Sequence, residues 1–323
     1  MDIRNSAVYR FFDRHRKLFV ALLLIIFLFL LGQITVSNFL SLAQILLTVK
    51  LASFIALFGL CQMIVIAGGG SGLDLSVGYT ATITSVLTAS VMDGKNENLW
   101  LAVLVALGIG IVVGSVNGAL AAYVKLPPLV VTLAMSQMLQ GTINVYTAGA
   151  NITGRPSPVL QIIAAKSTGI FPHILIILLI VTPIVMIVLN KTKWGMKLFG
   201  AGANETAAYL SGVNVRLVRC VAFILSGVLA SLIGLLLLGN MGIAFKDMGS
   251  NYVMPSIAAV VVGGVSLGGG DGNYLGVILG AIFLQTLSNL LVALGWGDAG
   301  KWVGFGTVLY VLLIVYVSNR RSR

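Results

Sequence analysis

Long apolar segments recur along the whole chain, and they leave few folds open to it. The runs Leu18–Leu31, Leu99–Ala122, Ile174–Leu189 and Val303–Val317 approach or reach the ~17 to 25 residues that a helix needs to cross a bilayer. Backbone groups inside a bilayer must find their hydrogen bonds within the protein, which favours helices. Only 9% of the residues are charged, whereas soluble domains carry roughly 25%. We therefore expect an all-α polytopic membrane protein.

The apolar pattern predicts about ten transmembrane helices in a single domain over residues 1–323. The expected spans lie near residues 18–36, 51–67, 76–92, 99–122, 128–146, 173–190, 217–240, 253–268, 274–294 and 302–318. With both termini in the cytoplasm, most of the 20 Lys and Arg residues fall in cytoplasmic segments, as is usual for membrane proteins. Because these residues flank apolar runs, the net charge of +11 indicates topology in a membrane and not a nucleic-acid partner.

Two glycine-rich stretches look alike at a constant offset along the chain. The first reads VIAGGGSGLDLSVGY at 65–79 and the second reads VVVGGVSLGGGDGNY at 260–274. The matching pairs are Gly68 with Gly263, Gly69 with Gly264, Ser71 with Ser266 and Tyr79 with Tyr274. This similarity predicts a parallel internal repeat with halves at roughly 18–122 and 217–318. Chance similarity between glycine-rich linkers is the alternative.

Glycines interrupt a membrane helix in each stretch, with Asp74 or Asp271 close by. A break of this kind must line a cavity or lie inside the protein, because unpaired backbone cannot face lipid. Asp74 either hydrogen-bonds a polar solute or caps the following helix at Ser76.

Glycines at 110, 114 and 118, and again at 272, 276 and 280, form small-xxx-small patterns that predict close helix packing.

Polar residues within or beside the apolar spans are candidates for lining a solute path, although each alone can equally serve to join helices. The candidates are Gln62, Ser71, Asp74, Asn117, Thr132, Gln137, Gln140, Asn144 and Ser266. Nearly all of them are uncharged hydrogen-bonding groups, which suit a neutral polyhydroxylated solute better than an ion. Few acids or bases are available to relay protons, which disfavours ion-coupled transport.

The longest inner loop, residues 190–219, contains a short expected helix from Asn204 to Leu210 that ends at Gly212. The helix is either a binding element for a soluble partner or an ordinary solvated helix. The sequence contains no G-x-x-x-x-G-K-[ST] phosphate loop and no H-E-x-x-H zinc pair. We therefore expect no catalytic or metal residues in this chain, and any ATP must be bound by another chain.

Four segments resemble the permease subunits of bacterial ABC importers for ribose and related monosaccharides. They are GLDLSVG at 72–78, KLPPLVVTLAMSQMLQGTINVYTAGANITG at 125–154, WGMKLFGAGANETAAYLSGVNVRLVR at 194–219 and IAAVVVGGVSLGGGDGNYLGVILGA at 257–281. The resemblance covers nearly the whole chain in order. The glycine stretch before LDLSVG is longer here than in the commoner GGIDLSVG form.

The resemblance implies an importer in the bacterial inner membrane that translocates a monosaccharide. It would contain two permease subunits, identical or different, two cytoplasmic ATPase domains that bind ATP and Mg²⁺, and an external sugar-binding protein. No cofactor is expected in this chain. The loop 190–219 would then dock on the ATPase through a coupling helix, formed at the matching positions by Asn204, Glu205, Ala207, Ala208, Tyr209 and Gly212. Closure of the ATPase pair would swing these helices and open the path alternately.

Three other functions compete with this one. A branched-chain amino acid ABC permease would have to handle a zwitterion, and the spans offer no clear charged pair for it. A secondary transporter would work without an ATPase. A membrane enzyme is disfavoured because no acid–base or metal constellation occurs in the sequence.

Overall fold

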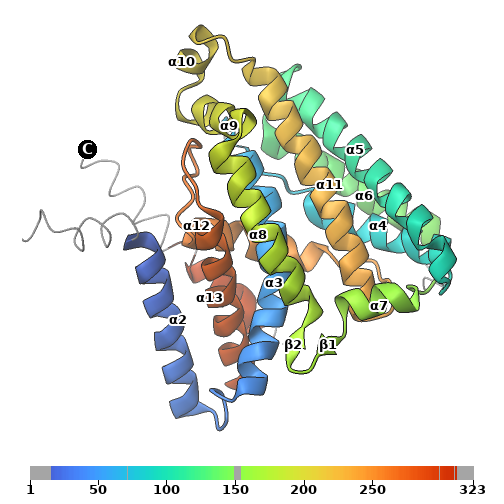
Figure 1. Ribbon diagram of the computed structural model, residues 1–323, viewed down its shortest axis with the longest axis vertical. Helices are drawn as coiled ribbons and strands as arrows, with labels where there is room; N and C mark the ends of the chain where they lie inside the picture. Colours follow the sequence, from blue (N-terminus) through green and yellow to red (C-terminus); the bar gives the residue numbers. More distant parts are fainter. Residues whose placement is uncertain (1–15, 71, 149–153, 298, 309, 311–323) are drawn as a thin grey trace, which may run out of the picture.

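Figure 1 shows the computed structural model, which describes residues 16–70, 72–148, 154–297, 299–308 and 310. The described chain is a bundle of helices with one minimal antiparallel hairpin, in which Ser167 pairs with Pro172 and Thr168 pairs with Phe171. The elements are α2 Arg16–Thr35, α3 Leu42–Ala67, α4 Val77–Met92, η2 Asn96–Asn98, α5 Leu99–Ala122, α6 Pro128–Thr147, α7 Pro158–Ala164, β1 Ser167–Thr168, β2 Phe171–Pro172, α8 His173–Lys191, α9 Lys193–Ala203, α10 Glu205–Leu210, α11 Val215–Met241, η3 Ser250–Tyr252, α12 Val253–Val262 and α13 Tyr274–Ala293. Residues 299–308 are also helical.

Six helical segments of the described chain are long and apolar enough to cross a membrane. They are Leu18–Thr35, Leu42–Ala67, Asn96–Ala122, His173–Lys191, Val215–Met241 and Tyr274–Ala293. The polytopic all-α membrane fold expected from the sequence is therefore confirmed. Three more expected spans coincide with α4 and α12, which are shorter, and with α6, which polar side chains interrupt. The span expected at 302–318 lies mostly outside the described residues, and its described part up to residue 308 is helical.

Two expected boundaries were wrong, each for a local reason. The span expected at 253–268 ends as a helix at Val262, because Gly264 takes the left-handed conformation with φ of +79°. The span expected from residue 51 begins as a helix at Leu42, where the Ser41 side chain accepts a hydrogen bond from the Gln44 N–H and caps the first turn.

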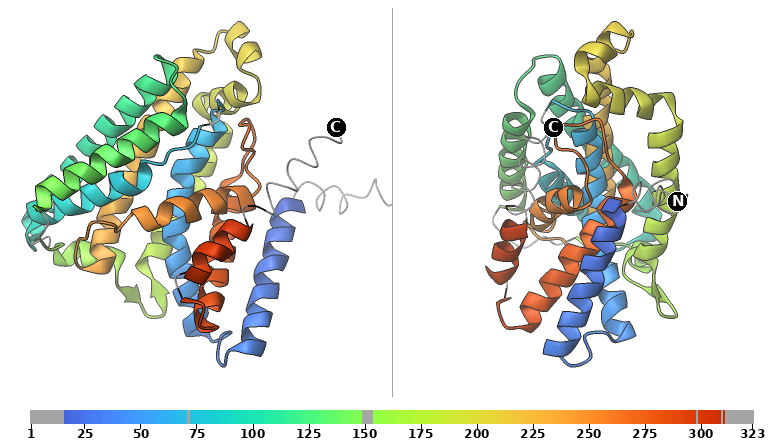
Figure 2. Two further views of the ribbon diagram at one scale, coloured as in Figure 1. Left: turned by 180° about the vertical axis from the view of Figure 1, so that it is seen from behind. Right: turned by 90° about the vertical axis from the view of Figure 1, so that its left-hand side faces the viewer.

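Helix α3 forms the centre of the bundle. All of its residues from Ala52 to Ala67 are buried, in keeping with their almost uniformly apolar character. Helices α8, α11, α12 and α13 pack against it, whereas α4, α5 and α6 lie together on the other side of α11, as Figures 1 and 2 show. Because α5 packs on α11 and α13 packs on α3, helices from the two expected halves alternate in space.

The glycine patterns predicted from the sequence lie where helices touch, except for Gly272, which precedes α13 in a loop. On α5, a methyl group at Gly110 would lie 2.6 Å from the carbonyl oxygen of Gly227, and one at Gly114 would lie 2.5 Å from that of Phe223. On α13, Gly276 and Gly280 lie against the backbone of Gly263 and Ala259 in the same way. Direct contact between two helix backbones gains packing energy, and a side chain in place of these glycines would push the helices apart and lose it.

Candidate functional site

Helices α3 and α12 each end in a pair of glycines with the same backbone conformation. Gly68 follows α3 with φ −69° and ψ −6°, and Gly263 follows α12 with φ −66° and ψ −4°. The next residues, Gly69 and Gly264, have φ of +76° and +79°. A residue with a side chain rarely adopts this left-handed conformation, so each pair ends its helix sharply.

After Gly69 the chain turns back along α3 as an extended segment that leads into α4. The Gln62 side chain on α3 pairs with this segment through both of its polar atoms: Nε2 donates to the Asp74 carbonyl at 2.7 Å, and Oε1 accepts from the Asp74 N–H at 3.2 Å. Gln62 is fully buried. Its amide therefore supplies the hydrogen bonds of the Asp74 N–H and carbonyl, which lie outside any helix and have no neighbouring strand among the described residues.

Asp74 is buried at 1% exposure and has three hydrogen bonds from serines. Its Oδ1 accepts from the Ser76 N–H at 3.0 Å and from the Ser76 hydroxyl at 2.6 Å. Its Oδ2 accepts from the Ser226 hydroxyl on α11 at 2.8 Å. The carboxylate thus forms an Asx turn with Ser76, the residue that precedes α4, and joins this turn to α11.

Helices α5 and α6 complete the support of the same segment. Asn117 Nδ2 donates to the Ser76 hydroxyl at 2.9 Å, Thr132 donates to the Leu73 carbonyl at 3.2 Å, and Ser136 donates to the Leu75 carbonyl at 2.8 Å. The Oδ1 atom of Asn117 is buried and has no hydrogen-bond partner among the described residues. Side chains from four helices thus hold one non-helical stretch inside the bundle.

The candidate path residues fall into separate groups. Gln62, Asp74, Asn117 and Thr132 are brought together around the extended segment, where their hydrogen bonds are to the protein itself. Gln137 and Asn144 lie on the exposed face of α6, and Gln140 is partly exposed. Ser266 is partly buried in the second glycine turn, where its N–H donates to the Asp271 carbonyl at 3.0 Å. Ser71 lies outside the described residues.

Sequence reasoning missed Ser136 and Ser226. Ser136 follows Thr132 by one helical turn, so the spacing could have revealed it. Ser226 lies far from Asp74 in the sequence and has no local signal.

The loop 190–219 folds into two short helices, of which the sequence predicted one. The expected helix at 204–210 is confirmed as α10: the Asn204 side chain accepts from the Ala207 N–H at 2.9 Å, and Gly212 follows its end with φ of +79°. The preceding helix α9 was missed. It is capped by Thr192, whose hydroxyl accepts from the Gly195 N–H at 3.2 Å.

Helix α10 projects at one end of the bundle (Figure 1) and exposes apolar side chains there. Tyr209 is 71% exposed and Leu210 is 79% exposed, whereas Ala208 is buried against the rest of the protein. Exposed aromatic and aliphatic side chains on a short, capped helix form a surface that a partner protein can contact.

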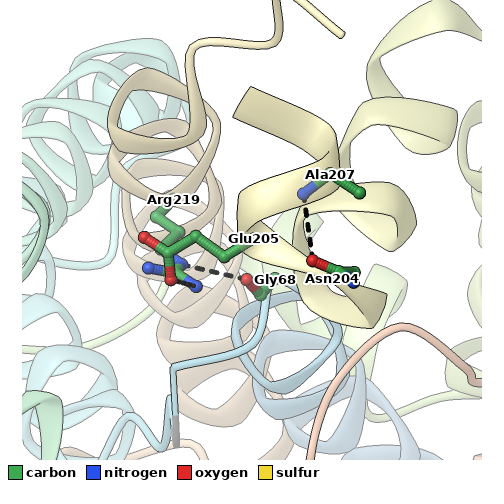
Figure 3. A network of polar contacts seen from close by, with 5 residues as sticks. All are labelled: Gly68, Asn204, Glu205, Ala207 and Arg219. Carbon is green, nitrogen blue, oxygen red and sulfur yellow. Dashed lines mark hydrogen bonds and ion pairs between the residues drawn. The ribbon is translucent and has the colours of Figure 1, made fainter. Parts of the chain in front are cut away.

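A single guanidinium connects α10 to the end of α3. Arg219 on α11 forms an ion pair with Glu205 on α10, with Nη2 and Oε2 2.8 Å apart, and its Nε donates to the Gly68 carbonyl at 3.1 Å (Figure 3). The Gly68 carbonyl lies at the C-terminus of α3, where partial negative charge attracts a cation. Arg219 thus contacts α10 and the first glycine turn at the same time.

The end of α9 contacts the turn that ends α3 and the glycine-rich loop that leads from α12 to α13. Gly202 lies against the Ala67 carbonyl, and a methyl group there would also lie 2.5 Å from the backbone nitrogen of Gly270. Gly270 in turn donates its N–H to the Ala67 carbonyl at 3.1 Å. The end of α9 thus rests on Ala67 at the end of α3 and on Gly270 in that loop.

A cavity of about 380 Å³ lies beside this connection. It is lined by the end of α3, the turn between α5 and α6, the start of α10 and the first turns of α11. Its charged lining residues are Lys125, Glu205, Arg216 and Arg219. Among the described residues, no group of three or more His, Cys, Asp or Glu side chains is arranged to hold a metal ion.

The sequence matches one family model and several characterised proteins. The model for the permease component of branched-chain amino acid transport systems matches residues 41–317. The fructose import permease of Rhizobium meliloti is 29% identical over 91% of this chain and 83% of its own length. The ribose import permease of Escherichia coli K12 is 33% identical over 78% of each chain. An autoinducer 2 import permease of Salmonella paratyphi B is 33% identical over 90% of this chain and 83% of its own length. No solved structure matches.

Proposed function

The chain belongs to the family of permease components of branched-chain amino acid transport systems, and we propose that it is the membrane-spanning permease subunit of an ATP-driven importer for a monosaccharide. The observation that carries this proposal is the similarity to ribose and fructose import permeases over most of the chain. The chain itself performs no covalent step, and its contribution is a gated passage through the bilayer.

The solute is neutral and polyhydroxylated, such as a ribose-like sugar. The arrangement of Asp74 supports this choice over an amino acid, because three hydrogen bonds from serines already occupy its carboxylate and leave it poorly placed to bind an ammonium group. The family description names amino acids, whereas the relatives compared above are named for ribose, fructose and autoinducer 2. A branched-chain amino acid permease remains the alternative that the test below addresses.

The passage runs along α6, between this chain and a second permease subunit that is either identical or different. Gln137 and Asn144 support this placement, because they are polar side chains on an exposed face of a membrane helix. Such groups are costly against lipid and favour contact with water or with a partner subunit. The groups around Asp74 then hold the extended segment in place instead of contacting solute.

The chain crosses the inner membrane about ten times as two parallel repeats, with both termini in the cytoplasm. The matching backbone angles of Gly68 and Gly69 with Gly263 and Gly264 support the repeat. The orientation depends on basic residues near the two ends of the chain, among them Arg10, Arg14, Arg320 and Arg321.

Helix α10 docks on a cytoplasmic ATPase that binds ATP and Mg²⁺, while an external sugar-binding protein delivers the solute. The exposed Tyr209 and Leu210 support the docking surface. The ion pair of Glu205 with Arg219 supports a path by which movement of the ATPase reaches the glycine turns and changes the access of the passage.

Transport in proteoliposomes tests this proposal. Vesicles containing the chain with its ATPase and binding protein are expected to accumulate radiolabelled ribose or galactose when ATP is supplied, and not leucine. Uptake of leucine alone would contradict the sugar assignment. Full uptake driven by a proton gradient in vesicles without the ATPase would contradict the ATP-driven mechanism and favour a secondary transporter.

A further inference from the structure

The cavity beside Arg219 combines an apolar interior with a cationic margin. Val65 on α3, Leu126 in the turn between α5 and α6, and Phe223 on α11 line its apolar part. Lys125, Arg216 and Arg219 line its charged part, together with Glu205. A cavity of this character suits an amphiphile with one anionic end.

The positive charge of the cavity is only partly neutralised. Glu205 is engaged by Arg219 at 2.8 Å, so its carboxylate compensates that guanidinium. Neither Lys125 nor Arg216 forms an ion pair among the described residues. Two cations therefore face the same cavity of about 380 Å³ without an acidic partner in the described part of the chain.

The backbone fixes the position of Lys125. Its φ of +65° is left-handed, which is uncommon for a residue with a side chain. The Leu126 N–H donates to the Leu120 carbonyl at 3.1 Å, and Pro127 and Pro128 follow directly. The turn thus places Lys125 on the cavity in a conformation in which glycine would be the less strained residue.

Arg216 lies in the first turn of α11, where a helix disfavours a cation. An anion in the cavity would offset that cost, because it would lie between Arg216, Lys125 and Arg219. No acidic side chain other than Glu205 lines the cavity.

We propose that this cavity binds a phosphate group. The headgroup of an anionic phospholipid is its favoured source, because the apolar lining fits the glycerol and the first acyl carbons while Lys125 and Arg216 contact the phosphate. A free phosphate ion offers nothing to the apolar part of the cavity. The proposal is independent of what the protein transports.

The test uses the purified full-length chain, with lipid removed, and follows its melting temperature and its bound lipids by native mass spectrometry. The probes are phosphatidylglycerol, phosphatidylcholine as a lipid without net charge, and inorganic phosphate. Phosphatidylglycerol is expected to raise the melting temperature and to remain bound, with phosphatidylcholine giving a smaller effect. Each cation removed should weaken retention of phosphatidylglycerol about fivefold.

The variants are Lys125→Gln with Arg216→Gln, and a control pair, Lys193→Gln with Lys197→Gln. The control removes the same charge from α9, whose lysines do not line the cavity. Lys125→Gly serves as a second single variant, because glycine accepts the positive φ and so keeps the fold while removing the cation.

Loss of phosphatidylglycerol retention in the cavity variants, with retention in the control, supports the proposal. Equal loss in both pairs would overturn it in favour of general surface attraction. A shift by inorganic phosphate as large as that by the lipid, and lost in the cavity variants, would support the phosphate site but overturn its lipid source. No response of the wild-type chain to any probe would overturn the proposal outright.

Discussion

Arg219 holds Glu205 and the end of α3 at the same time. Its Nη2 lies 2.8 Å from Glu205 Oε2, and its Nε donates to the Gly68 carbonyl at 3.1 Å. One side chain on α11 thereby joins the exposed helix α10 to the glycine turn that ends α3, whose residues from Ala52 to Ala67 are all buried. Glu205 and Tyr209, both on α10, allow the connection and the docking surface to be tested separately.

Replacement of Glu205 by Gln is expected to abolish sugar-stimulated ATP hydrolysis in the assembled importer. The carboxylate is 60% exposed, so the ion pair contributes at most about 1 kcal/mol to stability and its loss should barely alter the melting temperature. The measurement is ATPase activity of the complex with and without sugar. Arg219→Gln is expected to have the same effect, and the double variant should be no worse than either single variant. Wild-type stimulation in Glu205→Gln would contradict the role of this pair.

Replacement of Tyr209 by Ala is expected to reduce binding of the ATPase and sugar-stimulated hydrolysis without loss of membrane insertion. The side chain is 71% exposed on α10, so its truncation removes little packing within the chain. A buried tyrosine anchor at an interface is typically worth 2 kcal/mol or more, which corresponds to roughly 30-fold weaker ATPase binding. Trp100→Ala, at the start of α5 and 65% exposed, is the matched control. Equal binding by the Tyr209 variant and the wild-type chain would exclude α10 as the docking element.

The helical framework could be predicted from the sequence because its cause is local. Apolar runs bounded by glycine, proline and charge predict membrane helices, and the start of α5 at Leu99 and its end at Ala122 were predicted to the residue. Helix α9 was missed because its apolar residues are too few, and its glycines too many, for an apolar run. The glycine spacing on α5 predicted close packing but not the partner helix.

The site was less predictable because its contacts join distant parts of the chain. The spacing of Asp74 and Ser76 suggested from the sequence that the two residues bond at the start of a helix. The second partner of Asp74, Ser226, comes from α11 and could not be found in this way. Likewise Glu205 could be assigned to α10 from the sequence, whereas its pairing with Arg219 and the contact of Arg219 with Gly68 depend on how α11 crosses α3. Local patterns identify which residues are polar in an apolar setting, but only the fold shows what satisfies them.

Replacement of Gly202 by Ala is expected to destabilise the contact of α9 with the end of α3 and with Gly270. The added methyl group would collide with the Ala67 carbonyl and with the backbone of Gly270, neither of which can move as a side chain does. We expect a loss of about 1 to 3 kcal/mol and reduced coupling of ATP hydrolysis to transport.

Gly200→Ala is the matched control for this change. It lies in the same helix, and a methyl group there would meet nothing within 4 Å. Alanine should stabilise α9 by up to about 1 kcal/mol through its higher helix propensity. Thermal melting of both variants in detergent checks the prediction, and equal melting temperatures would contradict the contact.

Replacement of Gly114 by Ala is expected to force α5 away from α11. The methyl group would lie 2.5 Å from the Phe223 carbonyl and 2.6 Å from the Ile224 Cα. An overpacked contact of this kind costs about 1 to 3 kcal/mol. Gly108→Ala on the same helix has open space around it and should leave the melting temperature unchanged or slightly raised. If both variants melted alike, the close approach of α5 and α11 would be disproved.

Variants of Asp74 and Ser226 test whether Asp74 has a structural role or contacts the solute. Ser226→Ala removes the donor to Asp74 Oδ2, and we expect it to destabilise the protein by about 1 to 3 kcal/mol. Asp74→Ala should cost more, because it also removes the bonds to Ser76 at the start of α4. The matched control is Ser256→Ala on α12, a buried serine whose hydroxyl bonds the Val253 carbonyl on its neighbouring turn.

If Asp74 has a structural role, the Asp74→Ala variant melts at the lowest temperature and Ser226→Ala melts between it and the wild-type chain. The KM for sugar of the protein that remains folded then stays near the wild-type value. A solute contact would give the reverse result, with the KM raised tenfold or more and the melting temperature unchanged. Because the carboxylate is 1% exposed and its oxygens already accept three hydrogen bonds, we expect the first result. At 1% exposure, Asp74 could meet a sugar hydroxyl only if the packing of α11 against the start of α4 opened.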